Sequence, residues 1–400
     1  MIERHHMMMK TTLWLGPVLL IAVSGCKSAA ESRSNYVIGY TDMQCDDPRG
    51  QFYNGRTSRA MVVRADGTER REIGVSLITR PNTWTQFAGW WSESQATVHI
   101  SWESEENYLW EREHKTFRMT EGNWLVDCCL VDITTGTVKN LTMVERVSNY
   151  NVGVRPWPGD PTRATFAPLI NGIQHPFVMD SDGRNKKDLS SGKDGFTYGC
   201  NVSPDGQRIT YNKSYLVYVA EKDGSNPRRV DEDPKHTFQF IPTWSPDGQW
   251  LMFLAGEHHK CHPYLTRSDG TGLRKLADRG TYIGSFEPLK HPDFHSAGSD
   301  LPVWSPDSQW VYYTAQVGPS VELMRVSLSG QVQQLTHSRP GTEHYYPEVS
   351  PDSRLVAFGV RLNGAAALYV ADADGRNARP ITAPTPNHVQ MHPKWRPMVH

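Results

Sequence analysis

The sequence predicts an all-β protein, a seven-bladed β-propeller of four-stranded blades, and three observations support this prediction. First, a Ser-Pro-Asp phrase occurs four times, beginning at Ser203, Ser245, Ser305 and Ser350. Second, these serines are 42, 60 and 45 residues apart. A repeat of roughly 40–50 residues is typical of propeller blades. Third, each copy lies between short runs of apolar, β-branched and aromatic residues, as expected of strands joined by a turn.

The Ser-Pro-Asp phrase has the chemistry of a tight corner between two strands. Proline presets φ, the aspartate side chain bonds nearby backbone, and a glycine such as Gly206 or Gly248 adopts positive φ. Around Ser245, a strand over 238–244 leads into the corner. Further strands are expected at 250–254, 264–267 and 273–276.

Two less regular units precede these four. Their strands are expected at 96–102, 124–133, 163–168 and 175–180. The seventh blade is shared between the chain ends: 36–40 and 59–64 lack an inner strand, whereas 393–397 lacks the rest of its blade. Pairing of these segments would close the ring by a velcro closure, and the propeller would span residues 36–397.

The N-terminal segment has the pattern of a lipoprotein signal peptide over residues 1–25, followed by a polar tether over 26–35. An apolar stretch at 13–23 precedes Gly25-Cys26. This resembles the bacterial lipobox, which implies acylation of Cys26. Lys27 after the cysteine implies, by resemblance to Gram-negative sorting, the outer membrane. An ordinary cleaved signal peptide and a short anchor are the alternatives.

Charge and cysteine content narrow the function classes. The chain has 42 basic and 43 acidic residues, so no cationic surface for nucleic acid is expected. After Cys26, five cysteines remain at irregular spacing, which indicates buried thiols and no disulfide framework. No nucleophile elbow, phosphate loop or zincin motif is found.

The repeated corner resembles the PD40, or WD40-like, repeats of TolB-type propellers, and the resemblance covers about residues 36–397. It implies a propeller fold in a protein of the cell envelope. It does not imply a particular activity, because function resides in sites grafted on a fold.

Strand counting places the long loops on one face, the upper face, opposite the Ser-Pro-Asp corners of the lower face. His344 and Gln390 lie three residues before a proline of an inner strand, and His392 lies one before Pro393. These three could converge in the central channel and hold a metal ion. Alternatively, the histidines are hydrogen-bonded residues among packed loops. The expected ligand site at the upper channel mouth comprises His258, His262, His291, His295, His344, Gln390 and His392.

The same residues resemble the metal site of seven-bladed oligogalacturonate lyases, which use channel histidines and a glutamine. In that family the closing strand has histidines one and three residues before the proline. Here His392 matches, and Gln390 departs from the pattern. The resemblance implies a divalent metal (Mn, Ca or Zn), although the residues alone do not require any cofactor.

Two functions follow from this reading. The first is a lipid-anchored propeller on the periplasmic side of the envelope that binds an envelope protein or glycan through its upper face, without turnover. The second is a metal-dependent carbohydrate lyase or hydrolase at the same place. A mixed acidic and aromatic segment at 102–114 could form a lid helix, a sugar-stacking rim or a solvated face.

Overall fold

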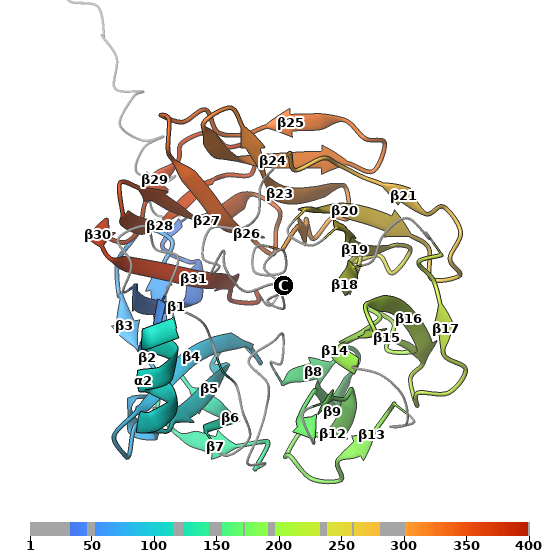
Figure 1. Cartoon of the computed structure of the whole chain (residues 1–400), viewed down its shortest axis with the longest axis horizontal. Helices are drawn as coiled ribbons and strands as arrows, with labels where there is room; N and C mark the ends of the chain where they lie inside the picture. The colour runs from blue at the N-terminus through green and yellow to red at the C-terminus, as the bar shows by residue number, and fades with distance from the viewer. Residues whose placement is uncertain are drawn as a thin grey trace, which may run out of the picture.

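The described part of the chain forms a ring of small sheets in this computed structural model (Figure 1). It comprises residues 33–45, 53–114, 118, 123–143, 154–170, 173–190, 197–232, 238–257, 260–280 and 301–398. Strands β8, β14, β18, β26 and β31 lie nearest the centre of the ring in Figure 1. The chain is therefore an all-β propeller of mostly four-stranded sheets, as its sequence predicts.

Four of the described sheets follow the simple order of a propeller blade, with four antiparallel strands running outward from the centre. The first is β4 (Thr83–Trp90), β5 (Gln95–Glu103), β6 (Trp124–Asp132) and β7 (Val138–Asn140). The second is β8 (Arg155–Trp157), β9 (Asp160–Phe166), β12 (Phe177–Asp180) and β13 (Lys187–Asp188). The third is β14 (Thr197–Val202), β15 (Arg208–Lys213), β16 (Leu216–Glu221) and β17 (Arg228–Arg229). The fourth is β18 (Phe238–Trp244), β19 (Leu251–Glu257), β20 (Lys260–Thr266) and β21 (Arg274–Lys275).

A nine-stranded sheet follows in the chain, and one parallel residue pair, Val321↔Glu343, joins its two halves. The first half contains β22 (Val303–Trp304), β23 (Trp310–Val317), β24 (Ser320–Ser327) and β25 (Val332–Gln334). The second half contains β26 (Glu343–Val349), β27 (Leu355–Leu362), β28 (Ala365–Asp372), β29 (Arg379–Pro380) and β30 (Thr385–Pro386). A small hairpin, β10 (Leu169–Ile170) and β11 (Ile173–Gln174), stands apart from the blades.

The closing sheet joins the two ends of the described chain. Its order is β3 (Arg71–Glu72), β2 (Tyr53–Arg64), β1 (Val37–Cys45) and β31 (His388–Trp395). β1 pairs antiparallel with β31, from Ile38↔Trp395 to Gln44↔His388. The pairing confirms the predicted closure, and the closing strand begins five residues earlier than Pro393, where the sequence places its start.

The Ser-Pro-Asp corners hold their turns with side-chain hydrogen bonds. Ser203 Oγ donates to Asp205 Oδ1 at 2.5 Å, and the same carboxylate oxygen accepts from Gln207 N at 3.1 Å. Arg208 N in turn donates to Ser203 Oγ at 2.9 Å. The three bonds recur in the corners that begin at Ser245, Ser305 and Ser350. The repeat therefore encodes a structural corner of the lower face.

The apolar core lies between neighbouring sheets. One cluster joins the closing sheet to β27 and β28 and contains Ile38, Tyr40 and Trp395. Cys45, Cys128, Cys129, Cys200 and Cys261 are buried, as predicted, and they are free thiols within the described residues. The described helices are η1 (Val75–Leu77) and α2 (Glu105–His114), and neither has the length and apolarity needed to cross a bilayer.

Candidate functional site

A bulge recurs in the inner strands, one residue before a proline. Ile241, Tyr346 and His392 occupy this position with φ of 55°, 50° and 52°, and the strand pairing shifts at each of them. Positive φ is strained for residues with a β-carbon, most of all for a β-branched one. A bulge re-aims its side chain relative to the strand. Its recurrence in three sheets makes it a regular part of these inner strands.

His392 and Tyr346 place their rings against each other at two neighbouring bulges. Their ring centroids are 4.3 Å apart. Tyr346 is buried, whereas His392 is exposed to solvent. Although His392 is exposed, the protein around it, and then the charge of Lys394, lower the pKa of its imidazole well below the usual value. His392 is therefore uncharged near neutral pH and offers both a donor and an acceptor.

Charged groups lie further along the same inner strands. Lys394 Nζ contacts Glu348 Oε2 at 2.7 Å, which links β31 to β26. Arg155 on β8 donates to Asn201 Oδ1 on β14 at 2.6 Å. The Arg155 side chain is solvent-exposed, yet desolvation by surrounding protein lowers its pKa, against the opposing effect of the Glu348 carboxylate. Glu348 thus acts electrostatically on cations from two separate sheets.

Gln390 forms a second polar group at the start of β31. Its Nε2 donates to Asp42 Oδ1 at 3.1 Å, and Asp42 Oδ2 accepts from Arg70 at 2.6 Å. His388 Nδ1 lies 3.6 Å from Asp42 Oδ1. The Gln390 side chain is 2% exposed, and its Oε1 has no hydrogen-bond partner. A buried acceptor left without a partner costs free energy, which makes Oε1 a notable atom of this region.

His344 lies at the start of β26 and contacts β24, in the other half of the nine-stranded sheet. Its Nδ1 is 2.7 Å from the carbonyl oxygen of Val321 and 3.7 Å from Glu322 Oε2. Glu322 also accepts from the hydroxyl of Thr336 at 2.5 Å. His344 is 3% exposed, so these contacts fix a buried ring. The contact with a carbonyl assigns the proton to Nδ1.

The structure describes one further residue of the predicted ligand site, His262. His262 lies on β20, the third strand of its sheet, where its Nδ1 accepts from Arg279 N at 3.0 Å and lies 3.6 Å from Asp278 Oδ1. Its role in ligand binding stays a prediction. Four of the residues predicted to bind a ligand or lipid lie outside the described part of the chain, namely Cys26, His258, His291 and His295.

The predicted metal ligands have separate neighbours. His344 contacts Val321 and Glu322, Gln390 contacts Asp42, and His392 packs on Tyr346. Within the described ranges, no group of three or more His, Cys, Asp or Glu side chains could hold a metal ion. A metal held by His344, Gln390 and His392 therefore stays a prediction.

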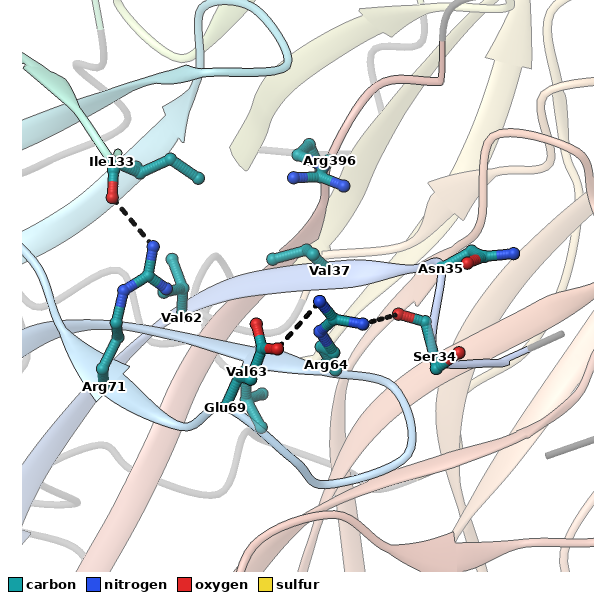
Figure 2. Close-up of a pocket in the computed structure, with 10 residues that line it drawn as sticks. All are labelled: Ser34, Asn35, Val37, Val62, Val63, Arg64, Glu69, Arg71, Ile133 and Arg396. Carbon is teal, nitrogen blue, oxygen red and sulfur yellow. Dashed lines mark hydrogen bonds and ion pairs between the residues drawn. The ribbon is translucent and has the colours of Figure 1, made fainter. Parts of the chain in front are cut away.

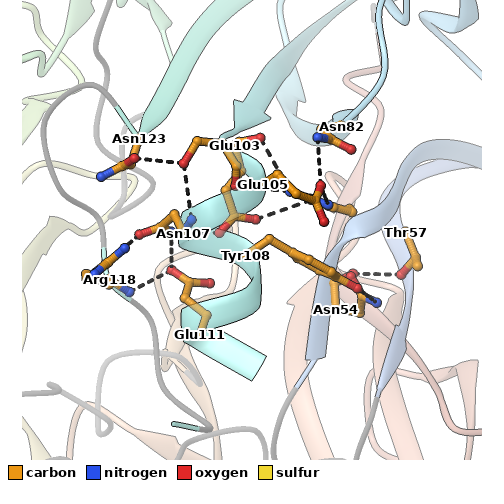
Figure 3. Close-up of polar contacts among 12 residues, drawn as sticks. Asn54, Thr57, Asn82, Glu103, Glu105, Asn107, Tyr108, Glu111, Arg118 and Asn123 are labelled. Carbon is orange, nitrogen blue, oxygen red and sulfur yellow. Dashed lines mark hydrogen bonds and ion pairs between the residues drawn. The ribbon is translucent and has the colours of Figure 1, made fainter. Parts of the chain in front are cut away.

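A buried acidic cluster anchors helix α2 to the upper face (Figure 3). Asn107 Nδ2 donates to Glu103 Oε1 at 2.7 Å and to Glu111 Oε1 at 3.1 Å. Arg118 donates its backbone N–H to Glu111 at 2.6 Å and its side chain to Asn107 Oδ1 at 2.8 Å. Glu103, Asn107 and Glu111 are all buried. The interpretation of this segment as a wholly solvated face is therefore wrong.

The carboxyl groups of Glu103 and Glu111 repel each other when both are ionised. Burial, and then the negative charge of Glu111, raise the pKa of Glu103 to about 7. Burial also raises the pKa of Glu111, against the Arg118 backbone N–H that favours its charged form. Arg56 lies 3.6 Å from Glu103 and packs its guanidinium 3.6 Å from the Tyr108 ring centroid. At neutral pH the pair therefore retains part of a proton.

Sequence reasoning missed the charged groups of the inner strands. Glu348 and Lys394 each follow the proline of their strand by one residue, and Thr243 and Val303 occupy the same position in other sheets. Comparing this position across the repeats would have revealed a charged pair. Nothing comparable marks Arg155 or Asp42, whose partners come from distant parts of the chain.

Comparison with known protein families finds no family that matches this chain. The curated proteins that are similar over part of it include the following two. The uncharacterized protein Atu1656 of Agrobacterium fabrum is 25% identical over 175 residues, 41% of this chain and 52% of that protein. The uncharacterized peptidase YuxL of Bacillus subtilis is 26% identical over 196 residues, 40% of this chain and 29% of that protein. The matched regions thus span about half, and less than a third, of these relatives.

Solved structures to which the chain is similar include oligogalacturonate lyase and TolB β-propellers. An oligogalacturonate lyase in complex with manganese has a TM-score of 0.54 and 11% identity, over 80% of both chains. The β-propeller domain of the Trilobed protease from Pyrococcus furiosus has a TM-score of 0.52 and 13% identity, over 87% of this chain and 95% of that one. TolB from Acinetobacter baumannii has a TM-score of 0.48 and 14% identity, over 92% and 68%. The first two support the β-propeller fold and nothing finer.

Proposed function

We propose that this protein is a cell-envelope propeller that binds an envelope protein or glycan through its upper face and the inner strands, without turnover. The supporting observation is the exposed His392 ring packed on Tyr346. Binding sites combine aromatic surface with a few placed polar groups, and here the uncharged imidazole of His392 offers both a donor and an acceptor. Of the two partner classes, these groups favour a glycan.

Charge favours an acidic glycan. Arg155 and Lys394 carry two positive charges, and Glu348 carries one negative charge. Lys394 is directly paired with Glu348, whereas the direct contact of Arg155 is with the neutral amide of Asn201, so the three groups together carry one net positive charge. A guanidinium pairs well with a sugar carboxylate, because it can donate two parallel hydrogen bonds.

The proton affinity of His392 favours binding without turnover. General-base catalysis works best when the pKa of the base is near the operating pH. The pKa of His392 is lowered well below its usual value, so its imidazole accepts a proton poorly. Near neutral pH, His392 is suited to hydrogen bonding and stacking.

A calorimetric titration tests the proposal. Oligogalacturonides and neutral oligosaccharides of equal length would be titrated into the purified chain and into His392→Ala. We expect binding of the acidic series and up to about tenfold weaker binding by the variant, since a stacking contact of an uncharged ring contributes about 0.5–1.5 kcal/mol. Equal affinity of both proteins for both series would contradict the proposal.

Reaction products and metal content distinguish binding without turnover from the competing function, a metal-dependent lyase or hydrolase. A lyase would generate unsaturated sugars that absorb ultraviolet light, and added manganese would accelerate their appearance. Elemental analysis would find stoichiometric Mn, Ca or Zn that is lost in His344→Ala. Product formation with these properties would replace binding without turnover by the enzymatic function.

We further propose that the ring has seven blades. The five four-stranded sheets count once each, and the nine-stranded sheet counts as two, since only one residue pair joins its halves. Each half contains a Ser-Pro-Asp corner between its first two strands, at Ser305 and Ser350. An experimental structure with six or eight inner strands around the centre would refute this count.

We also propose that the protein is anchored by lipid at Cys26, on the periplasmic side of the outer membrane. The lipobox-like Gly25-Cys26 and the polar tether support this location. Replacing Cys26 with Ser should move the protein from the membrane fraction to the soluble fraction. Membrane association that survives Cys26→Ser would indicate an uncleaved anchor instead.

A further inference from the structure

A small pocket lies on the lower face, where the closing strand ends and β1 begins (Figure 2). Its volume is about 180 Å³. Three of its lining residues are Arg64, Arg71 and Arg396, and the acid among its lining residues is Glu69. It is separate from the inner strands that carry the proposed function.

Arg64 and Arg71 differ in how their guanidinium groups are bound. Arg64 contacts Glu69 Oε1 at 2.8 Å and donates to the carbonyl oxygen of Ser34 at 3.1 Å. Its Nε is buried and has no hydrogen-bond partner. Arg71 donates to the carbonyl oxygen of Ile133 at 2.8 Å, a contact that leaves its charge uncompensated.

Arg396 provides the third guanidinium. Its backbone N–H donates to Val37 O at 2.8 Å, which fixes the residue directly after the closing strand. Among the described residues, its side chain makes no hydrogen bond or ion pair, and Figure 2 shows it at the pocket without a contact to the other residues drawn. Three guanidinium groups and one carboxylate leave the pocket with two net positive charges.

We propose that this pocket binds an oxyanion of the phosphate class. Guanidinium groups bind phosphate oxygens through paired N–H donors, and a bound dianion would balance the two excess charges. The phosphate could be free in solution or carried by a lipid headgroup, since both present the same oxygens, and the experiment separates these sources.

The first probe is inorganic phosphate, titrated by calorimetry into the full chain bearing Cys26→Ser. We expect one site per chain and about tenfold weaker binding by Arg396→Ala and by Arg71→Ala. Arg396→Lys, which keeps the charge and loses the planar fork, should bind with intermediate affinity. The matched control is Arg354→Ala, an exposed arginine in a Ser-Pro-Asp corner of the same face, which should bind like the parent chain.

The second probe is vesicles of phosphatidylcholine with and without phosphatidylglycerol. Cosedimentation that requires phosphatidylglycerol and is lost in Arg396→Ala would identify the lipid headgroup as the source. Binding of inorganic phosphate without such cosedimentation would identify a soluble source. If neither probe binds, or if Arg396→Ala and Arg71→Ala bind like Arg354→Ala while all melt like the parent chain, the proposal is overturned.

Discussion

Gly39 has no room for a side chain, because the closing sheet and its neighbour meet there. A β-carbon added to Gly39 would lie 2.0 Å from Cζ of Phe87. Phe87 is buried, and its backbone N–H donates to Thr41 Oγ1 at 3.0 Å. The ring packs in a buried cluster, with its centroid 5.3 Å from that of Trp90, so it cannot withdraw without disturbing this packing. A single glycine therefore permits the close approach of two blades at the seam.

Replacing Gly39 with Ala should lower the free energy of unfolding by about 1–3 kcal/mol, the usual cost of overpacking a core. Chemical denaturation measures the change. Gly55→Ala is the control, since its added β-carbon would be 3.7 Å from the Trp84 ring, an ordinary contact. The double variant Gly39→Ala, Phe87→Leu should recover part of the loss. Equal stability of the two alanine variants would contradict this account of the seam.

Helix α2 depends on polar contacts more than on apolar packing. Ser104 Oγ accepts from Asn107 N at 3.2 Å, which caps the first turn. Tyr108 accepts from Asn54 at 3.2 Å, so the helix is tied to β2. Leu109 on the opposite side is exposed. The attachment of this helix therefore depends on the charge of the buried Glu103 and Glu111 pair.

The raised pKa of Glu103 predicts a stability that falls with pH. The raised pKa means that the folded chain holds the Glu103 proton to about pH 7, whereas the unfolded chain releases it near the ordinary glutamate pKa of 4.5. The contribution of this group is therefore fully present below pH 4.5 and is lost as pH rises to about 7. Glu103→Gln should flatten the decline and be more stable at pH 8, by on the order of 1 kcal/mol.

Urea denaturation between pH 5 and pH 8 measures this difference. Glu105→Gln serves as the control, because Glu105 is exposed and the neighbouring Arg56 lowers its pKa, so both folded and unfolded chains carry its charge in this range. Its profile should run parallel to that of the parent chain. Parallel profiles for Glu103→Gln as well would show that the buried pair does not hold a proton.

At the scale of the whole molecule, one strand joins the chain ends. β31 pairs with β1, Trp395 donates through Nε1 to Glu348 O at 2.8 Å, and Lys394 contacts the same residue. These contacts connect β31 to β1 in its own sheet and to β26 in the neighbouring sheet. Without β31, the inner edge of β1 would be unpaired, and the ring would be open there.

Deleting residues 393–400 should therefore open the ring. The melting temperature should fall by on the order of 5–10 °C, because Trp395 is buried and closes a core cluster. Deleting only 399–400 leaves the strand intact and should have no effect. Differential scanning calorimetry compares the two, and equal melting of the longer deletion and the parent chain would refute the closure.

A structural feature of this protein could be predicted from the sequence when the residues that form it lie close together in the chain. The Ser203 corner forms bonds within five residues, so a short phrase predicts it. The closure was predictable because a strand at 393–397 lacks a blade of its own. In contrast, Arg155 meets Asn201 only when two sheets pack together, and Gln390 meets Asp42 only when the ring closes. Glu111 contacts Arg118 and Trp124. The helical periodicity of residues 102–114 does not predict these two contacts.

The most direct test of the proposed binding site is the affinity of Arg155→Gln for an acidic oligosaccharide, measured by calorimetry at fixed low salt. Among the described charged groups of this region, Arg155 contacts a neutral amide and not a carboxylate, and a charge-assisted hydrogen bond to a ligand contributes about 1.5–3 kcal/mol. We predict at least about tenfold weaker binding, while Arg184→Gln in an exposed corner binds like the parent chain. Unchanged affinity of a normally folded Arg155→Gln would contradict binding at the centre of the ring.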